Sequence, residues 1–354
     1  MEKKQVSYKS ILVPSVQQLA SSDSVTTVPT RYLRPDQQAA AVADDLSGLQ
    51  IPVIDFRSLL SADSMEFESS KLHHACRDWG FFQLVNHGVS SSFVEKVKKE
   101  IKEFFNMPMD EKKKLWQTPK EIEGFGQAFV VSEEQKLDWA DMFFITVRPI
   151  ASRKPYLFQN LPLFFRDTME EYSLQLQNLA MVMLEKIGKT LNIKKEEIKD
   201  MFEDGIQSFR MNYYPPCPQP EKVIGLSPHS DSVALTILLQ LNEVEGLQIR
   251  KDGKWILVEP LPEAFIVNIG DILEIVSNGV YRSIEHRVIV NVTKERLSMA
   301  TFYSTRPGGA IGPAPSLINE QKRALFKTVT LEEYFKRLFS HELNGKYFLD
   351  EMRI

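Results

Sequence analysis

The amino-acid sequence predicts a mixed α and β fold, in which an antiparallel β barrel or jelly roll is surrounded by helices. From residue 207 onwards, short strand-like runs alternate with turn signals, of which Asp252-Gly253 and Asn278-Gly279 are the clearest. Antiparallel strands at this spacing are typical of a barrel or jelly roll. Before them, apolar residues recur every three or four positions from 163 to 191, which predicts one long helix. We expect this helix to buttress the sheet, although its single apolar stripe would also suit a coiled coil.

The chain divides into four parts by composition and periodicity. They are an N-terminal extension and linker, a helix-rich region, the jelly-roll core and a C-terminal helical segment, at residues 1–48, 49–203, 204–308 and 309–354. The first part mixes short apolar patches with polar and Ala-rich stretches, so we expect a weakly specified extension with an exposed linker before the first strand. The last part contains Thr330-Leu-Glu-Glu333, a capping box that predicts the start of a helix.

Strands and helices alternate in the helix-rich region. Residues 51–56 predict a first strand, and one-sided apolar residues predict a helix from Ser64 to Trp79. A second strand is expected at 81–87. Ser92-Phe-Val-Glu95 has the pattern of a capping box and predicts the start of a further helix, with an outward ion pair between Glu95 and Lys99.

The two turn signals of the core predict two hairpins. The Asp252-Gly253 turn separates the strand-like run 247–250 from 254–258, and the Asn278-Gly279 turn separates 271–276 from 281–285. The proline-rich segment 215–220 follows a strand directly, which favours a stiff connecting loop over a polyproline recognition motif.

The composition is that of a soluble globular protein. The 354 residues are 43% hydrophobic and carry a net charge of −4, so there is no basic field for nucleic acid. No run approaches 18 apolar residues, and no apolar segment typical of a signal peptide follows the start. Cys76 and Cys217 are too few and too far apart for a disulfide framework. We therefore expect a cytoplasmic monomer that binds neither nucleic acid nor membrane.

Pairs of polar residues separated by one position mark the candidate site. The pairs are Asn212 and Tyr214, His229 and Asp231, and Arg296 and Ser298. Positions i and i+2 of a strand lie on the same face, so each pair places two polar groups in one space. His286, on a strand-like run between the last two pairs, would add a third metal ligand, with a buried structural role as the alternative. Two imidazoles and one carboxylate on one side of a metal are the ligand set of non-haem Fe(II) oxygenases.

Arg296 and Ser298 predict a binding site for a carboxylate. A guanidinium group binds a carboxylate through two parallel charge-assisted hydrogen bonds, and the neighbouring hydroxyl adds another donor. On the last strand, Arg296, Ser298, Ala300 and Phe302 share one face, which is too polar at one end to be only core. A surface salt bridge is the alternative for Arg296.

In this order, the motifs resemble those of the plant 2-oxoglutarate- and Fe(II)-dependent dioxygenases. The matching residues are Asn-Tyr-Tyr-Pro at 212–215, His-Ser-Asp at 229–231, His286 with Arg287, and Arg-Leu-Ser at 296–298. The resemblance covers nearly the whole chain, from Val13-Pro-Ser-Val-Gln through Trp79-Gly-Phe-Phe-Gln and Asn86-His-Gly. Gly124-Phe-Gly-Gln-Ala-Phe and Leu137-Asp-Trp-Ala-Asp are most similar to the senescence-related and alkaloid O-demethylase-like branch.

The resemblance implies a distorted double-stranded β-helix and an enzyme that uses Fe(II), 2-oxoglutarate and O2, with ascorbate as reductant. It implies that His229, Asp231 and His286 bind the iron. It also implies that Arg296, Ser298 and Tyr214 hold the distal carboxylate of 2-oxoglutarate, and that Asn212 lines the same site. The implied reaction hydroxylates or O-demethylates an aromatic specialised metabolite, such as an alkaloid or flavonoid, and releases succinate and CO2.

The substrate residues follow less directly from the sequence. Phe302 faces inward beyond the carboxylate site and resembles a family position that stacks on flat substrates, although core packing would suit it equally. Further candidates for lining a substrate pocket are Arg210, Phe125, Phe129 and Phe144.

Two other functions compete with this interpretation. The related ascorbate-using oxidases that form ethylene share the iron ligands and the Arg-x-Ser pair but lack the second Tyr of Asn-Tyr-Tyr-Pro, so Tyr214 argues against them. A non-enzymatic jelly-roll protein with a structural metal would have no carboxylate site, so Arg296 and Ser298 argue against that function.

Overall fold

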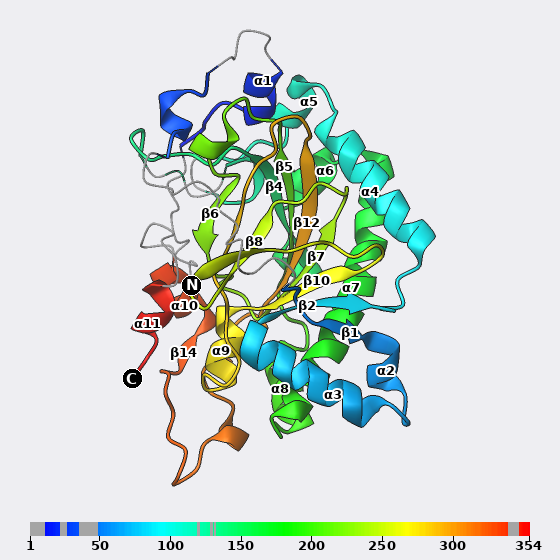
Figure 1. Ribbon diagram of the computed structural model, residues 1–354, viewed down its shortest axis with the longest axis vertical. Coiled ribbons are helices and arrows are strands. Elements are labelled where there is room, and N and C mark those ends of the chain that lie inside the picture. Colours follow the sequence, from blue (N-terminus) through cyan, green and yellow to red (C-terminus); the bar gives the residue numbers. More distant parts are fainter. Residues whose placement is uncertain are drawn as a thin grey trace.

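Two β-sheets lie at the centre of the molecule, and helices surround them (Figure 1). The computed structural model describes residues 11–21, 27–34, 49–118, 121–127, 130, 132–338 and 347–354. The larger sheet has eight strands in the order β1-β2-β10-β7-β12-β5-β4-β3. In chain order they are β1 (Val53–Asp55), β2 (Phe81–Val85), β3 (Gly124–Gly126), β4 (Asp141–Arg148), β5 (Gln207–Tyr214), β7 (Leu235–Gln240), β10 (Phe265–Ile269) and β12 (Arg296–Tyr303).

The smaller sheet has four antiparallel strands in the order β6-β11-β8-β9. They are β6 (Leu226–His229), β8 (Leu247–Lys251), β9 (Lys254–Leu257) and β11 (His286–Val288). Together with the antiparallel strands at the centre of the larger sheet, they form the jelly roll that the sequence predicts. The larger sheet also contains β1 to β4 from the helix-rich region, so this region and the core share one sheet. A separate pair, β13 (Ala310–Ile311) and β14 (Val329–Thr330), follows the core.

The long predicted helix is α7 (Leu163–Thr190), and it buttresses the larger sheet as expected. It contacts β4, β7 and β12, and the buried stripe that includes Phe165, Leu176 and Ile187 belongs to the main hydrophobic core. Helices α3 (Met65–His74), α4 (Ser91–Phe105) and α8 (Lys195–Phe202) pack against it. The remaining helices are α1 (Val16–Ala20), α2 (Phe56–Leu60), α5 (Met109–Lys113), α6 (Pro155–Asn160), α9 (Asp271–Val276), α10 (Leu331–Leu338) and α11 (Tyr347–Glu351).

Residues 271–276 form helix α9, so the prediction of a strand there was wrong. All six residues are buried, including the acidic Asp271 and Glu274, and a short buried run does not distinguish a strand from a helix by its periodicity. The turn signal that follows is a real turn, with positive φ at Asn278 (51°) and Gly279 (81°). It ends the helix, because the Gly279 N–H donates to the Glu274 carbonyl at 2.9 Å. The first hairpin is confirmed, since β8 and β9 flank Asp252-Gly253.

One predicted helix cap was misplaced and one is confirmed. The N-cap of helix α4 is Ser90, two residues before the predicted Ser92, and its hydroxyl accepts the Phe93 N–H at 3.3 Å. Glu95 pairs with Lys98 instead of Lys99. The cap of α10 is as predicted, with the Glu333 N–H donating to the Thr330 hydroxyl at 3.1 Å.

The described parts of the N-terminal extension are packed against the core, whereas we expected this extension to be weakly specified; residues 35–48 of the expected exposed linker lie outside the described residues. Asp141 on β4 accepts hydrogen bonds from the Ser15 hydroxyl (2.5 Å), the Val16 N–H (2.8 Å) and the Gln17 N–H (3.0 Å). Only 1% of Asp141 is exposed. Tyr32 packs edge-on against the buried ring of Trp139. The sequence pattern missed these contacts because their partners lie more than a hundred residues away.

The two cysteines are both buried and unpaired. Among the helices of the described ranges, none combines the length and the apolar character that crossing a membrane requires.

Candidate active site

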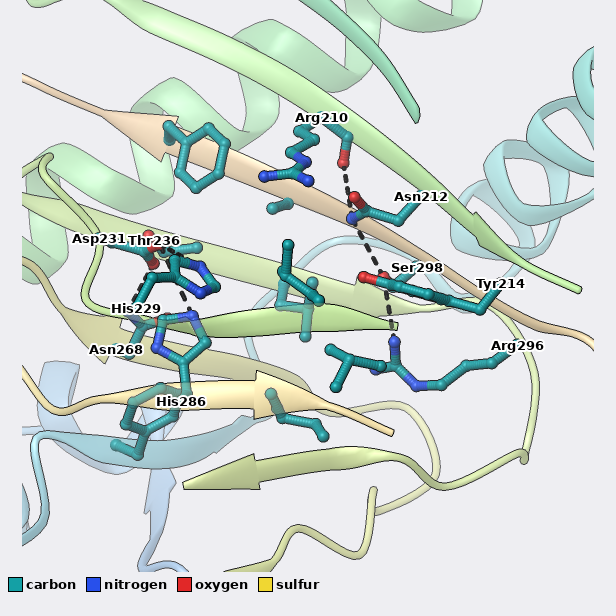
Figure 2. Close-up of a pocket in the computed structure, with 17 residues that line it drawn as sticks. Arg210, Asn212, Tyr214, His229, Asp231, Thr236, Asn268, His286, Arg296 and Ser298 are labelled. Carbon is teal, nitrogen blue, oxygen red and sulfur yellow. Dashed lines mark hydrogen bonds and ion pairs between the residues drawn. The ribbon is translucent and has the colours of Figure 1, made fainter. Parts of the chain in front are cut away.

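A narrow cavity lies between the two sheets, and polar residues gather at its two ends (Figure 2). At one end are His229 and His286 from the smaller sheet, together with Asp231. At the other end, Arg296 and Ser298 point toward each other. The sequence therefore predicted two polar sites, and the structure places both in one cavity.

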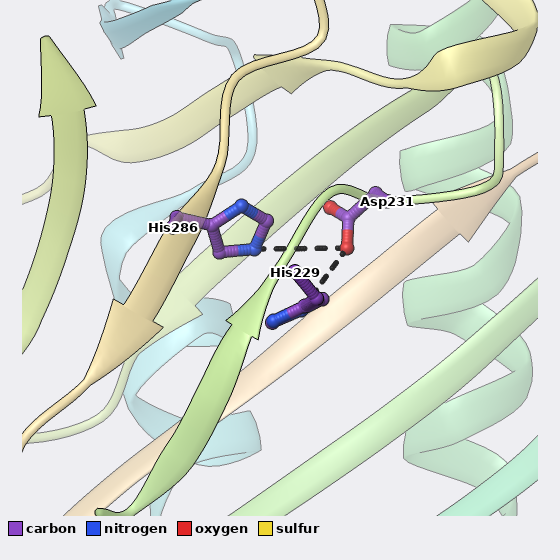
Figure 3. Close-up of side chains that lie close together, drawn as sticks. All are labelled: His229, Asp231 and His286. Carbon is purple, nitrogen blue, oxygen red and sulfur yellow. Dashed lines mark ion pairs between the residues drawn. The ribbon is translucent and has the colours of Figure 1, made fainter. Parts of the chain in front are cut away.

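The two histidines and the aspartate converge because β6 and β11 are neighbours (Figure 3). His286 pairs with His229 across these strands, and the centroids of their rings are 4.2 Å apart. Oδ1 of Asp231 lies 3.6 Å from Nε2 of each histidine. The candidate ligand atoms all lie within 4.8 Å of one another, so one ion could contact all three.

Asp231 lies in the turn after β6, not on the strand as the i, i+2 argument assumed. The Asp271 N–H holds this turn by donating to the Asp231 carbonyl at 2.7 Å. The backbone also passes very close to Gly270, where an added Cβ would lie 2.1 Å from the Val233 carbonyl oxygen. Only glycine fits there without moving the turn, so Gly270 helps to place the carboxylate.

Hydrogen bonds leave the metal-binding atoms of the three side chains free to face one another. Nδ1 of His229 donates to the Ser227 carbonyl (2.8 Å), and Nδ1 of His286 donates to the Ile284 carbonyl (3.2 Å). A carbonyl only accepts, so each Nε2 keeps its lone pair. Oδ2 of Asp231 accepts from the Thr236 hydroxyl (2.6 Å) and the Asn268 amide (2.8 Å), which leaves Oδ1 for a metal. Two nitrogens and one carboxylate oxygen on oriented side chains fit Fe(II).

The protonation states also suit metal binding. Burial opposes ionisation of Asp231, but the neighbouring His286 and His229 outweigh it and hold the pKa of this carboxyl well below its usual range. Burial and the nearby His229 lower the pKa of His286 to about 4. At neutral pH the site therefore presents a carboxylate and a neutral imidazole, the forms in which these residues bind metals.

The carboxylate site is formed where β5 and β12 pair. Arg296 lies opposite Tyr214 and Ser298 lies opposite Asn212, so the two sequence pairs are neighbours in register. The Asn212 amide donates to the Ser298 hydroxyl at 3.3 Å. The Arg296 guanidinium lies over the Tyr214 ring, 5.4 Å from its centroid, and one of its nitrogens donates to Gln240 Oε1 at 2.9 Å.

Arg296 is a buried cation without a carboxylate partner among the residues that the structure describes. It is 1% exposed, its Nε makes no hydrogen bond within this part of the chain, and burial lowers its pKa. A buried guanidinium is costly unless an anion compensates it. The site therefore fits an anionic group that enters the cavity from outside, and it excludes the surface salt bridge considered from the sequence.

A larger cavity of about 270 Å³ adjoins the first and shares Arg210, His229, Asp231 and Phe302 with it. Of the other predicted substrate residues, Phe144 on β4 lines the larger cavity. Phe125 lines neither cavity, because it packs into the core against the rings of Phe104, Phe105 and Trp116. Phe129 lies outside the described residues.

The sequence analysis missed other residues that line the larger cavity. They include Glu123, Met142, Ile206, Phe335 and Leu338. The last two come from helix α10, more than a hundred residues after the metal-site turn. Their presence depends on how α10 packs, and no spacing or motif in the sequence signals it.

The sequence analysis also missed Thr236, Asn268 and Gln240, which support the candidate metal and carboxylate sites.

Both halves of the chain match known protein families. Residues 205–305 match the 2OG-Fe(II) oxygenase superfamily, and residues 51–163 match the N-terminal domain of non-haem dioxygenase in morphine synthesis.

Similar proteins cover almost the whole chain. Protein SRG1 of Arabidopsis thaliana is 59% identical over 98% of this chain and 98% of its own length. Oxoglutarate-dependent flavonoid 7-O-demethylase 1 of Ocimum basilicum is 53% identical, over 98% of this chain and 92% of the relative. Codeine O-demethylase of Papaver somniferum is 50% identical, over 97% of this chain and 96% of the relative.

A solved structure has the same fold. The crystal structure of JOX2 in complex with 2OG, Fe and JA superposes with a TM-score of 0.88 at 35% identity, covering 98% of this chain and 99% of that one. These findings confirm the resemblance and the interpretation as an enzyme, and they exclude a non-enzymatic jelly roll. The chain belongs to the 2OG-Fe(II) oxygenase superfamily, and its cofactor and cosubstrates are Fe(II), 2-oxoglutarate and O2.

Proposed function

We propose that this oxygenase acts on an aromatic specialised metabolite of the flavonoid or alkaloid kind and removes an O-methyl group from it. One observation carries the proposal: the 270 Å³ cavity, lined by Phe144, Phe302 and Phe335, borders His229 and Asp231. Cavities of a few hundred Å³ with mostly apolar walls and few polar groups are typical of small-molecule sites. The relatives named as flavonoid and codeine O-demethylases support the same substrate class.

In the proposed mechanism, His229, Asp231 and His286 would hold the iron. The chemistry that Fe(II) supplies is activation of O2, coupled to conversion of 2-oxoglutarate to succinate and CO2. Thr236 and Asn268 keep one oxygen of Asp231 directed at the iron by binding the other.

Arg296 and Ser298 would bind the distal carboxylate of 2-oxoglutarate. The buried Arg296 offers its charge and several N–H donors in an enclosed space, where a charge-assisted hydrogen bond is strong. Tyr214 lies against the guanidinium, and Asn212 donates to the Ser298 hydroxyl, so both orient the donors. Gln240 fixes one end of the guanidinium from β7.

The remaining residues position the substrate. Aromatic side chains on both sides of the larger cavity favour a flat ring system, and the methyl group nearest to the iron is the one that reacts. Oxidation of a methoxy C–H gives a hemiacetal, which collapses to formaldehyde and a phenol. Hydroxylation of a ring or an alkyl carbon would use the same site, and the choice depends on which C–H lies closest, since a displacement of about 1 Å can change the rate roughly a hundredfold.

We also infer a cytoplasmic monomer that works on small molecules and not on nucleic acid, with ascorbate keeping the iron reduced. The net charge of −4 argues against nucleic-acid binding, and light scattering of the purified protein tests the oligomeric state. We propose the segment 204–308 as the catalytic core, between the helix-rich region 49–203 and the C-terminal segment 309–354. The family match at 205–305 supports these boundaries.

The test is a panel of aromatic methyl ethers incubated with Fe(II), ascorbate, O2 and 2-oxoglutarate. We expect flavonoid or alkaloid methyl ethers to release formaldehyde and succinate in equal amounts. A panel in which only small aliphatic acids are oxidised would reject the proposed substrate class. Release of succinate with a hydroxylated product and no formaldehyde would keep the class but reject demethylation.

A further inference from the structure

A buried carboxyl group lines the larger cavity at a distance from the metal site. Glu123 precedes β3 and is 6% exposed. The other charged residues of this cavity are Arg210 and the metal-site residues His229 and Asp231. Glu123 is therefore the only carboxyl among the described lining residues that is not assigned to the metal.

One row of neighbouring residues connects Glu123 with the metal site. Thr236 on β7, Phe302 on β12, Ser208 on β5 and Thr146 on β4 are paired in this order across the sheet. At one end of the row, the Thr236 hydroxyl donates to Asp231. At the other end, the Thr146 N–H donates to Oε2 of Glu123 at 2.8 Å.

This row gives the length of the cavity wall between the two sites. Three strand spacings separate Thr236 from Thr146, which amounts to about 14 Å at roughly 4.8 Å per spacing. Phe302, Ser208 and Thr146 all line the larger cavity, so the row is its wall. A flat ligand that lies along this wall with one end at the iron has its other end near Glu123.

Two carboxyl groups, of Glu121 and Glu123, and the ammonium group of Lys154 lie close together at this end of the cavity. Lys154 forms ion pairs with both Glu121 and Glu123, so two carboxylates share one ammonium group. The pair with Glu123 is the longer one, with Lys154 Nζ 3.9 Å from Oε1, too far for a hydrogen bond. Burial raises the pKa of Glu123, whereas the Thr146 N–H and Lys154 favour its ionised form. Oε1 is thus an acceptor that Lys154 does not saturate.

Building on the proposed function, we propose that Glu123 is a substrate-binding residue that accepts a hydrogen bond from a hydroxyl or ammonium group of the aromatic substrate. This donor is carried at the end of the molecule opposite to the methoxy group that is oxidised. The substrate class is therefore narrower than aromatic methyl ethers in general: it contains those with a distal donor.

Three flavones that differ at one position test this directly. They are 7-methoxyflavone, its 4′-hydroxy derivative and its 4′-aminomethyl derivative, so that the last two distinguish a hydroxyl from an ammonium donor. We expect kcat/KM for formaldehyde release from at least one donor-bearing flavone to exceed that of 7-methoxyflavone by roughly tenfold to a hundredfold, as is typical of hydrogen bonds to charged groups. Equal values for all three in the wild-type enzyme overturn the proposal without any variant.

The variant Glu123→Gln separates substrate binding from a structural role, and Glu121→Gln is its matched control. The glutamine keeps a carbonyl oxygen for the Thr146 N–H but removes the charge. Glu121 shares Lys154 with Glu123 but does not line the cavity, so its variant changes the local charge equally. We expect the ratio of kcat/KM between the donor-bearing flavones and 7-methoxyflavone to fall to within about threefold in Glu123→Gln. The Glu121→Gln variant should retain the wild-type ratio. A purely structural role of Glu123 would lower kcat/KM for all three flavones by the same factor, which contradicts the proposal.

A binding measurement separates failure of this inference from failure of the proposed function. Equilibrium dialysis of the three flavones is carried out with the iron- and 2-oxoglutarate-loaded protein in the absence of O2. If no flavone releases formaldehyde but the donor-bearing ones bind more tightly to the wild type than to Glu123→Gln, demethylation is wrong and the role of Glu123 stands. If formaldehyde is released from all three at equal kcat/KM, the proposed function stands and the role of Glu123 is wrong.

Discussion

The two adjoining cavities share a wall but are built in different ways. The narrow cavity takes its polar residues from short sequence motifs on paired strands, such as Arg296 opposite Tyr214 on β12 and β5. The larger cavity takes its lining from segments that the sequence does not relate, from Glu123 before β3 to Leu338 at the end of α10. The narrow cavity contains hydrogen bonds between its own polar residues, such as Thr236 with Asp231 and Asn212 with Ser298, whereas the larger cavity adds the aromatic side chains of Phe144 and Phe335. This difference matches two tasks. The shared oxidation chemistry needs polar groups in a fixed geometry, whereas substrate choice depends on the shape of the wall of the larger cavity.

The largest effect should come from removing a metal ligand. His229→Ala, Asp231→Ala and His286→Ala should each lower iron content and succinate formation by at least about a hundredfold, because losing a direct ligand exceeds the effect of losing its support. Iron analysis and succinate assays measure this. His87→Ala is the control, since this imidazole packs on Phe265 outside both cavities. Near-normal iron content in any of the three variants would remove that residue from the ligand set.

The next largest effect should separate the two ends of the narrow cavity. Arg296→Lys keeps the positive charge but loses the bidentate donor pair, so the 2-oxoglutarate concentration for half-maximal rate should rise roughly tenfold to a hundredfold while iron content stays the same. Tyr214→Phe should act in the same direction and more weakly. The exposed Arg250, which pairs with Glu285, provides the control Arg250→Lys. Loss of iron with unchanged 2-oxoglutarate dependence would reverse the assigned roles.

A smaller effect should distinguish the two ends of the row that runs from Thr236 to Thr146 along the wall of the larger cavity. Thr236→Val preserves shape but removes the hydroxyl that orients Asp231, so iron affinity should fall roughly tenfold. Thr146→Val, at the other end of the row, should leave iron affinity within about twofold of the wild type. Titration of the metal-free protein with Fe(II) under argon gives both affinities. Equal losses in the two variants would mean that the effect is not specific to the metal site.

The smallest effect on rate should come from the shared wall. Phe302→Ala enlarges both cavities at one point, so product ratios should change several-fold among aromatic substrates while the 2-oxoglutarate requirement changes less than about twofold. Product analysis is combined with succinate measurement, which detects turnover uncoupled from substrate oxidation. The comparison between the cavities fails if product ratios are unchanged, or if small aliphatic substrates are preferred.

The polar pairs of the narrow cavity could be predicted from the sequence because they follow local rules, whereas Thr236 and Asn268, which also line it, could not. Alternation along a strand places Arg296 and Ser298 on one face, and each motif contributes two side chains to the same space. The three candidate ligands lie close together even though Asp231 lies beyond the end of β6. The close approach of Gly270 to the Val233 carbonyl helps to place that turn. It could not be predicted from the sequence because the two segments are distant along the chain.

The larger cavity and some elements were not predictable for the same reason. Phe125 and Phe144 look equivalent as aromatic residues on strands, yet one packs into the core and the other lines the cavity. Only the order of the strands and the position of the helices decide between them. The misread run at α9 shows the related limit of periodicity, since six buried residues in succession have no exposed face to reveal their period.

The buried Asp141 has a consequence for the order in which this chain folds. Its three hydrogen bonds join residues 15–17 to a strand about 125 positions later. During synthesis, the Val16 and Gln17 amides therefore lack this carboxylate acceptor until β4 has left the ribosome. Contacts of such long sequence separation require closure of a long loop, which costs conformational entropy, so they form late. Protection of the Val16 amide from hydrogen exchange would thus report on completion of the sheet, although Val16 is among the first residues made.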